Sequence, residues 1–209
     1  MLDVHPPHAA THTWRDFFIH IATIVVGLLI AVGLEQTVEF FHHRHQASEA
    51  RVNIQKEVTA NITALHYNLQ KLDESTRDFQ TSLDALNSKA PDAEVLAHLK
   101  YQWELTREAD TAWVGAKVDG SLALIPPVEL RRANYLYTSN SEATSTLFAY
   151  FIDVDTAAAI VDHARMTSTL TDLDRQQLIA RTTSALGYTR LLSRFYRIHQ
   201  EIAEKINLE

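Results

Sequence analysis

The chain contains no cysteine, and only five glycines and five prolines occur among its 209 residues. Without cysteine it cannot form a disulfide, a cysteine-based zinc site, an iron–sulfur cluster or a thiol nucleophile. So few glycines and prolines leave little material for the many turns of an all-β fold. The composition therefore favours long helices joined by few turns. The absence of cysteine is compatible with either side of a membrane, so it does not identify the compartment.

Positive charge is also scarce. Lys and Arg number 19 against 26 Asp and Glu, and the net charge is −7 with histidine neutral. Because nucleic-acid binding needs a basic face, we expect no nucleic-acid partner. The familiar enzymatic signatures, HExxH, the P-loop, GxSxG and the glycine-rich dinucleotide turn, are missing as well. We therefore predict neither an enzymatic activity nor a cofactor.

A long apolar run near the N-terminus is the most prominent feature that is present. Residues 17–34 contain no full charge and one histidine. As a helix they span about 27 Å, close to the hydrocarbon thickness of a bilayer. A cleaved signal peptide normally begins with basic residues, and this chain has no Lys or Arg before Arg15. A buried core helix is seldom this long. We predict a tail at 1–16, a transmembrane helix at 17–34 that reaches residue 41 if tilted, and a helical domain at 42–209.

The orientation in the membrane is left open by the charges that flank this run. Arg15 precedes it, whereas Arg44 and Arg51 follow it. Counting basic residues slightly favours a cytoplasmic C-terminal domain, but the difference is one residue, and long domains cross largely regardless of charge.

One face of the predicted span combines small and ionisable residues. They recur at steps of three or four, which stacks them along one side of a helix. Small residues let a second helix approach closely in lipid. We therefore expect a homo-oligomer or a membrane-protein partner besides the lipid bilayer; the alternative is that the pattern reflects the ordinary composition of spans. This packing face comprises Asp16, His20, Thr23, Gly27, Ala31 and Glu35.

The rest of the chain predicts an all-α fold, in which the transmembrane helix continues into an elongated antiparallel bundle of four or five helices. Apolar residues alternate steps of three and four in two stretches. The boundaries we expect are an end of the long helix at residues 87–91, helices at about 93–117 and 127–137, a break at 139–141, and a last helix capped by Asp172. The seams are Ile62, Leu65, Leu69, Leu72, Thr76, Phe79, Leu83, Leu86, and Ala185, Tyr188, Leu192, Phe195, His199, Ile202, Ile206.

Candidate chemical groups are few. His42, His43 and His45 could bind a transition metal with Glu39, but on one helix they do not converge, so we predict an interfacial collar and no metal site. A loose acidic group is better explained by caps and solvated faces, and the aromatic residues by core packing, with a groove as the alternative for the tyrosines. These residues are Asp153, Asp155, Asp162 and His163, then Trp103, Trp113, Tyr135 and Tyr137 near Arg131 and Arg132.

The first 45 residues, HPPH…TWRDFFIHIATIVVGLLIAVGLEQ…HHRH, resemble a group of uncharacterised bacterial membrane proteins. Their pattern is a span ending in Gly-Leu-x-x-x-x-Glu, here Gly33, Leu34 and Glu39, followed by a His-rich collar and a helical domain. Residues 119–132, followed by Tyr135-Leu-Tyr137, are also similar to the middle of such proteins. The resemblance implies a single-pass protein of the bacterial inner membrane with a periplasmic domain, and it implies no activity.

Three functions stay open at this point. The leading hypothesis is a membrane-anchored interaction or scaffold module that self-associates. The alternatives are a ligand or metal sensor that signals through a partner protein, and an enzyme of unrecognised type. A polar cavity with converging ionisable groups would favour the sensor or the enzyme, whereas a dry core with an exposed apolar patch would favour the interaction module.

Overall fold

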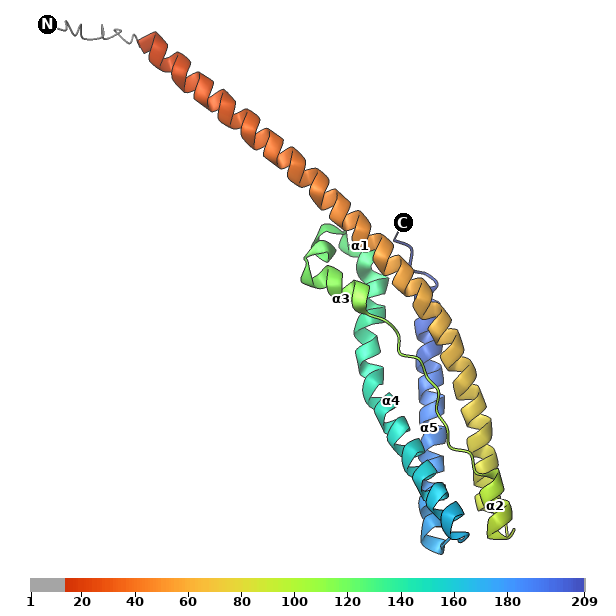
Figure 1. Ribbon diagram of the computed structural model, residues 1–209. Helices are drawn as coiled ribbons and strands as arrows, with labels where there is room; N and C mark the ends of the chain where they lie inside the picture. Colours follow the sequence, from red (N-terminus) through yellow and green to blue (C-terminus); the bar gives the residue numbers. More distant parts are fainter. Residues whose placement is uncertain (1–13, 209) are drawn as a thin grey trace, which may run out of the picture. The chain divides into compact units, whose positions relative to one another are not determined.

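The computed structural model describes residues 14–208, apart from the side chains of residues 141 and 142, and every regular element in that range is a helix (Figure 1). The all-α prediction is therefore confirmed for these residues, while most of the predicted tail at 1–16 lies outside them. The chain divides into two compact units, residues 1–46 and 47–209. The elements are α1 (Trp14–Leu86), α2 (Asp92–His98), α3 (Thr111–Val118), the 3-10 helix η1 (Ser121–Leu124), α4 (Pro127–Thr167) and α5 (Asp172–Ala203).

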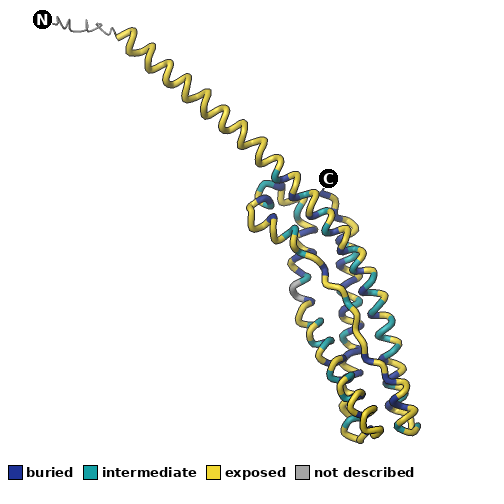
Figure 2. Tube along the Cα trace, in the orientation of Figure 1, coloured by how far each residue is buried: buried dark blue, intermediate teal, exposed yellow. Residues whose placement is uncertain are grey.

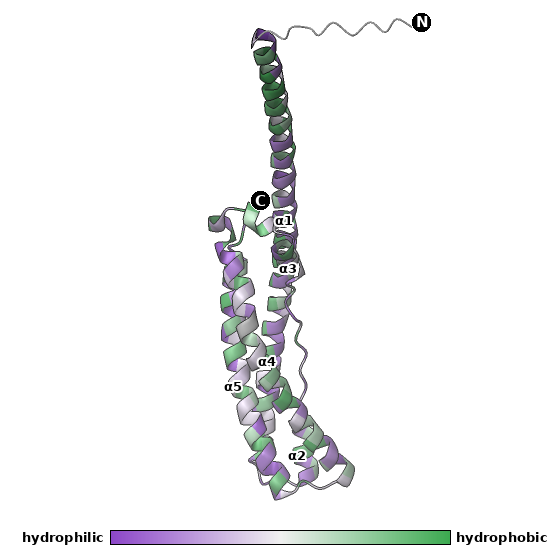
Figure 3. Ribbon diagram, turned by 90° about the vertical axis from the view of Figure 1, so that its left-hand side faces the viewer, coloured by the Kyte–Doolittle hydropathy of each residue, from purple (hydrophilic) through white to green (hydrophobic). Residues whose placement is uncertain are grey.

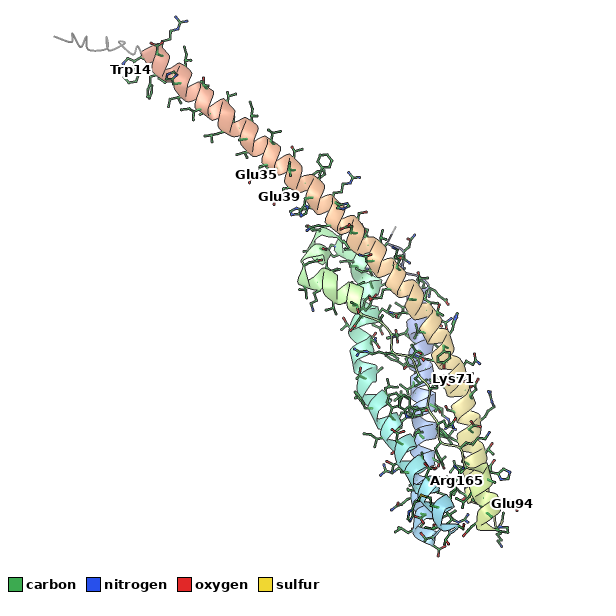
Figure 4. The ribbon with its side chains drawn as sticks, in the orientation of Figure 1. Trp14, Glu35, Glu39, Lys71, Glu94 and Arg165 are labelled. Atoms are coloured by element: carbon green, nitrogen blue, oxygen red, sulfur yellow. The ribbon has the colours of Figure 1, made fainter. Side chains whose placement is uncertain are left out.

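The first unit is the beginning of α1. Its residues from Trp14 to His45 are exposed (Figure 2), and the apolar run of residues 17–34 forms the most hydrophobic stretch of the helix (Figure 3). Glu35 and Glu39 are the first acidic residues after this run (Figure 4). The helix is long and apolar enough here to cross a bilayer, and α4 passes the same test of length and composition.

The second unit is built on three long helices: α1 from Ala47 onward, α4 and α5. Helices α4 and α5 run antiparallel side by side (Figures 1 and 3), joined by a short turn in which Ser168 adopts φ +55°. The core side chains that are fully enclosed include Leu65, Leu72, Phe79 and Tyr150. The predicted bundle of four or five helices is thus three long helices with the short α2 and α3 beside them.

Arginines tie the ends of these helices together. Arg165 of α4 (labelled in Figure 4) donates hydrogen bonds to the carbonyls of Leu96 and Leu99, at 3.1 and 3.0 Å, where α2 ends. Arg175 of α5 donates to the carbonyl of Leu86 at 2.7 Å, where α1 ends. Each guanidinium therefore satisfies carbonyl groups that a helix end leaves without intrahelical partners.

Several predicted boundaries are confirmed by the structure. Helix α1 ends at Leu86, directly before the predicted stop at 87–91. Gly120, which lies between the predicted helices at 93–117 and 127–137, adopts φ +83°, a backbone conformation that glycine reaches without steric cost. Pro127 is the first residue of α4, where its missing N–H costs nothing.

Two other boundaries were predicted wrongly. Helix α4 continues through residues 139–141, because the Ser139 hydroxyl donates to the carbonyl of Tyr135 at 2.7 Å and so fits inside the helix. The cap of α5 is Thr171 rather than Asp172. Its side chain accepts from the Asp174 N–H at 3.1 Å while the Asp174 carboxylate accepts from the Thr171 N–H, which makes a reciprocal capping box.

The predicted helix at 93–117 is also wrong. Only α2 and α3 are helical there, and residues 99–110, which we name the connecting segment, are extended between them (Figure 1). The segment is rich in helix-forming residues, so local propensity pointed to a helix. Contacts with α1 override that propensity, as the site geometry shows below.

Candidate functional site

The connecting segment is held by side chains of α1 that take the place of a neighbouring strand. The Asn68 side chain accepts from the Thr106 N–H at 2.7 Å and donates to the Thr106 carbonyl at 2.8 Å. Asn61 forms the same pair of bonds with Ala109, at 2.7 and 2.8 Å. Both asparagines are buried. Their amides thus satisfy backbone groups that have no secondary structure of their own.

These hydrogen bonds from α1 side chains to the backbone of the segment are named the ladder, and further α1 residues extend it toward both ends of the segment. The Ser82 hydroxyl accepts from the Lys100 N–H at 3.1 Å. The Glu57 carboxylate accepts from the N–H groups of Ala112 and Trp113, at 2.7 and 3.3 Å, in the first turn of α3. A negative charge is favourable at such a helix start. Together these contacts fix the path of the segment along α1.

A buried polar cluster lies where the segment meets α4 and α5. Glu108 of the segment, His199 of α5 and Ser139 of α4 form it. The Oε2 atom of Glu108 is 3.4 Å from Nδ1 of His199, and Nε2 of His199 is 2.8 Å from Oγ of Ser139. The side chains of Glu108 and His199 are only 2% and 1% exposed. Two ionisable groups are therefore enclosed together without bulk water.

The other carboxylate oxygen of Glu108 is not accounted for. Oε1 is buried and has no hydrogen-bond partner among the residues that the structure describes. A buried acceptor without a partner costs free energy, and such groups are rare in native proteins. An unpartnered carboxylate oxygen therefore marks a position where a donor from outside the chain would be stabilised.

Glu108 also lines an aromatic groove of the bundle, which has a volume of about 460 Å³. The segment forms one wall and α4 the other, and the lining is more apolar than polar. Concave sites of this size and composition are typical of small-molecule binding. The groove is lined by Trp103, Leu105, Thr106, Arg107, Glu108, Asp110, Tyr137, Asn140, Ala143, Thr144, Leu147, Phe148, Phe151 and Tyr196.

Ring contacts fix several of the aromatic side chains around the groove. Trp103 stacks on Phe151 with ring centroids 4.0 Å apart, and its indole N–H donates to Asp155 at 2.9 Å. Tyr137 stacks on Trp113 at 4.9 Å. The walls are therefore preorganised rather than loose, which reduces the entropy lost when a ligand binds.

The tyrosines of the groove stay neutral. The Tyr137 hydroxyl donates to Glu57 at 2.8 Å, and burial together with this carboxylate raises the pKa of Tyr137 well above its usual range. Burial and the charge of Glu108 likewise raise the pKa of Tyr196. Both side chains therefore present neutral aromatic surfaces next to the carboxylates.

The buried cluster has the order of groups found in serine hydrolases, but its setting differs. In a catalytic triad the serine hydroxyl faces the substrate, and free backbone N–H groups stabilise the oxyanion. Ser139 instead lies inside α4 and donates to the carbonyl of Tyr135, while the neighbouring N–H groups belong to the helical ladder. The arrangement suits the holding of a charge better than acyl transfer.

The packing face predicted for the anchor lies in the first unit, and nothing in the structure tests it. All six residues, from Asp16 to Glu35, are in α1 and exposed. A side chain added at Gly27 would meet open space within the described chain. The hydroxyl of Thr23 donates to the carbonyl of Ile19 at 2.9 Å, so it is satisfied inside its own helix.

The other predicted groups are distributed as follows. His43 lies 3.8 Å from Glu39, and the described part of the chain holds no group of three side chains suited to a metal ion. Asp153 is a buried partner of Arg181, at 2.6 Å, rather than a solvated residue. Trp103 and Tyr137 line the groove, whereas Tyr135 is exposed. For Tyr137, the groove and the core prove to be compatible roles.

Sequence reasoning missed the cluster itself. His199 was recognised only as a member of the apolar seam of α5, and Glu108 was not singled out. A histidine at a core position of an amphipathic helix needs a buried polar partner, and this was the available signal. That partner lies 91 residues away in an extended segment, so no spacing rule could identify it.

Comparison with protein-family models, with curated proteins and with solved structures found no match for this chain. The resemblance to bacterial single-pass membrane proteins therefore stays a prediction, and the function has to be argued from the groove and the apolar helix.

Proposed function

We propose that the chain is a membrane-anchored ligand-binding domain, in which an apolar helix holds the protein in a bilayer and a helical bundle binds a small molecule. One observation carries the proposal: Glu108 lines an aromatic groove of about 460 Å³, and one oxygen of its buried carboxylate has no partner among the described residues. Perturbed or unsatisfied ionisable groups in a concave apolar site are the usual mark of a binding site.

The anchor is assigned to residues 17–34 of α1. These residues are exposed on every side of the helix and apolar, which is costly in water and favourable in lipid. Helix α4 is assigned to the bundle, because Tyr150, Val154 and Val161 are buried in the core and Asp153 pairs with Arg181 of α5. A bacterial inner membrane with the bundle in the periplasm fits the resemblance of the N-terminal segment.

The groove favours a binding domain over a pure scaffold. Glu108, His199 and Asp110 are ionisable and lie at or beside the groove, and five aromatic side chains surround them. A scaffold needs a complementary outer surface but no enclosed charged groups. Binding of a ligand in the groove would be transmitted to a membrane-protein partner. The domain would then act as a sensor.

The experiment compares a filled groove with a distant control in the full chain, purified in a mild detergent. Thr144→Trp places a large ring in the groove from an exposed position of α4, and Ala159→Trp adds the same ring to an exposed position on the same helix away from it. A mixture of small metabolites is screened for compounds that raise the melting temperature. A compound present at about 100 times its Kd stabilises a protein by about 2.7 kcal/mol.

We expect at least one compound to stabilise the wild-type chain and Ala159→Trp but not Thr144→Trp. If every stabilising compound also acts on Thr144→Trp, the groove is not the binding site. If none stabilises the wild-type chain, the ligand-binding proposal fails and the scaffold becomes the better explanation.

An interaction module is the second candidate function. Phe148 and Ile152 lie one turn apart on α4, and each is 60% exposed, an unusual pair for a solvated helix face. A second copy of the chain or a membrane protein would cover them. Phe148→Ser with Ile152→Ser should then lower crosslinking to that partner without changing the melting temperature by more than a few degrees.

A further inference from the structure

We infer that the groove binds a cationic amine carried on a flat apolar body, with Oε1 of Glu108 as its counter-ion. This inference rests on the proposed ligand-binding function and names the chemical class of the ligand. Its basis is a juxtaposition: Glu108, whose buried Oε1 has no partner among the described residues, lines the same groove as five aromatic side chains.

The first argument is the hydrogen bonding of Glu108. His199 approaches only Oε2, at the long distance of 3.4 Å, and Oε1 accepts from nothing in the described residues. An ammonium group brings three N–H donors and a full positive charge, and charge-assisted bonds to carboxylates are among the strongest hydrogen bonds in proteins. A neutral donor would satisfy the geometry of Oε1 but not its charge.

The second argument is the balance of charge around the groove. Glu108 and Asp110 are its two carboxylates, and Arg107 is the basic residue among its lining. The Arg107 side chain is 84% exposed and lies 3.9 Å from Asp110, so it directs its charge to the solvent and to that residue. An anionic ligand would face both lining carboxylates while the lining Arg107 is turned toward the solvent, whereas a cation would be attracted.

The third argument is the shape and chemistry of the walls. The rings of Tyr137, Phe148, Phe151 and Tyr196 line the groove together with Trp103. Aromatic faces carry negative quadrupole charge, which attracts cations, and they pack well against flat apolar groups. The same walls are unsuitable for a divalent metal, which prefers several oxygen ligands. The described residues contain no such group of three side chains.

The test uses three probes that differ in one group: phenethylammonium, phenethyl alcohol and phenylacetate. Each is titrated calorimetrically into the full chain in detergent. We expect the ammonium to bind about tenfold or more tightly than the alcohol, because the buried charge pair adds a strong hydrogen bond. Phenylacetate should not bind, since its carboxylate would face Glu108.

Two variants locate the effect. Glu108→Gln keeps the size of the side chain and removes its charge, so the ammonium should lose about tenfold in affinity while the alcohol changes by less than about twofold. Glu104→Gln is the matched control, because Glu104 lies in the same segment but pairs with Lys71 outside this groove. It should change neither affinity. The comparison of probes on the wild-type chain stands even if a variant fails to fold.

The outcomes separate this inference from the proposed function. Equal affinities for the three probes would overturn the amine and leave the groove as a binding site. No binding of any probe at millimolar concentration would also overturn the amine. The proposed function then stands or falls with the Thr144→Trp screen, which does not depend on these probes.

Discussion

The two asparagines of α1 and the pair of Glu108 and His199 are buried to nearly the same degree, and both sets contact the connecting segment, from α1 and from α5. Asn61 and Asn68 use both the oxygen and the nitrogen of their amides, each with one bond donated and one accepted. Glu108 uses one oxygen and leaves the other without a partner. The difference separates buried polar groups that fix the path of the segment from the unpartnered Oε1, at which we propose that a ligand binds.

The largest loss of stability is expected from replacing one of the asparagines, whose amides are hydrogen-bonded to the segment. Asn68→Leu has a similar volume but takes both hydrogen-bond partners away from the N–H and the carbonyl of Thr106, at the position of a fully buried amide. Each lost partner costs about 2 kcal/mol, so the free energy of unfolding should fall by about 4 kcal/mol. Urea titration of the full chain in detergent, followed by circular dichroism, measures it.

Asn53→Leu is the control for this prediction, since Asn53 is exposed on the same helix. It should change the free energy of unfolding by less than about 0.5 kcal/mol. Similar losses in both variants would mean that the ladder contributes nothing beyond the helix itself.

A slightly smaller loss of stability is expected from replacing His199, the partner of the incompletely hydrogen-bonded Glu108. His199→Leu leaves the Glu108 carboxylate buried with neither oxygen paired, which should destabilise the bundle by about 3 kcal/mol. Adding Glu108→Gln removes the uncompensated charge and should recover most of that loss. A double-mutant cycle on the same urea titrations gives the coupling; additive losses would contradict a direct interaction between Glu108 and His199.

An exposed polar contact should matter less than either buried one. Thr171→Ala removes the cap of α5 and should lower the free energy of unfolding by about 1 kcal/mol. The Thr171 hydroxyl also holds the pKa of Asp174 below its usual value of 3.8. A lowered carboxyl pKa contributes stability that is complete above the unfolded value and is lost as the pH falls through the folded value.

The part of the cap contribution that depends on the Asp174 carboxylate should therefore be constant at neutral pH and should decrease as the pH falls below 3.8, whereas the bond from the Asp174 N–H to the Thr171 hydroxyl does not titrate. Thermal melts of the wild-type chain and Thr171→Ala between pH 3 and pH 7 test this. The two curves should draw closer at the acid end, and a difference that is the same at pH 3 and pH 7 would mean that the Asp174 carboxylate contributes nothing to the cap.

The smallest effect is expected in the anchor, where no buried polar contact is involved. Gly27→Ile should leave membrane insertion and the unfolding of the bundle unchanged, because Ile is at least as apolar and the site is open. If the packing face joins two copies, self-association in a membrane two-hybrid assay should weaken by about 0.6 kcal/mol or more. Leu28→Ile lies off that face, and equal behaviour of the two variants would dismiss it.

The long helices were predictable because their core positions repeat. Leu65, Leu72 and Phe79 occupy the buried row that periodicity indicated. The second buried row of α1 was placed one residue too late, at Ile62 and Leu69, because only apolar residues were counted. Those side chains are half-buried, and the buried positions belong to Asn61 and Asn68.

The extended path of residues 99–110 was beyond sequence reasoning for a related reason. Its backbone partners are side chains of a helix some 40 residues earlier, as the separations of 38 and 48 residues show. Local propensity favours a helix there, and only tertiary contacts reverse it. The groove was missed with it, because Glu108 reaches His199 only when this segment is extended.

The hydrogen bonds of the ladder are spaced at matching lengths along α1 and along the segment. Asn61 and Asn68 are seven residues apart, a rise of about 10.5 Å in an α-helix. Their partners Ala109 and Thr106 are three residues apart, and three residues of extended chain cover about 10 Å. Ser82 and Lys100 keep the same ratio farther along, with both intervals doubled. The segment thus runs antiparallel to α1, and three of its residues cover the same length as seven residues of the helix. Deleting a single residue between Lys100 and Thr106 would therefore shift one end of the segment away from its hydrogen-bond partners on α1.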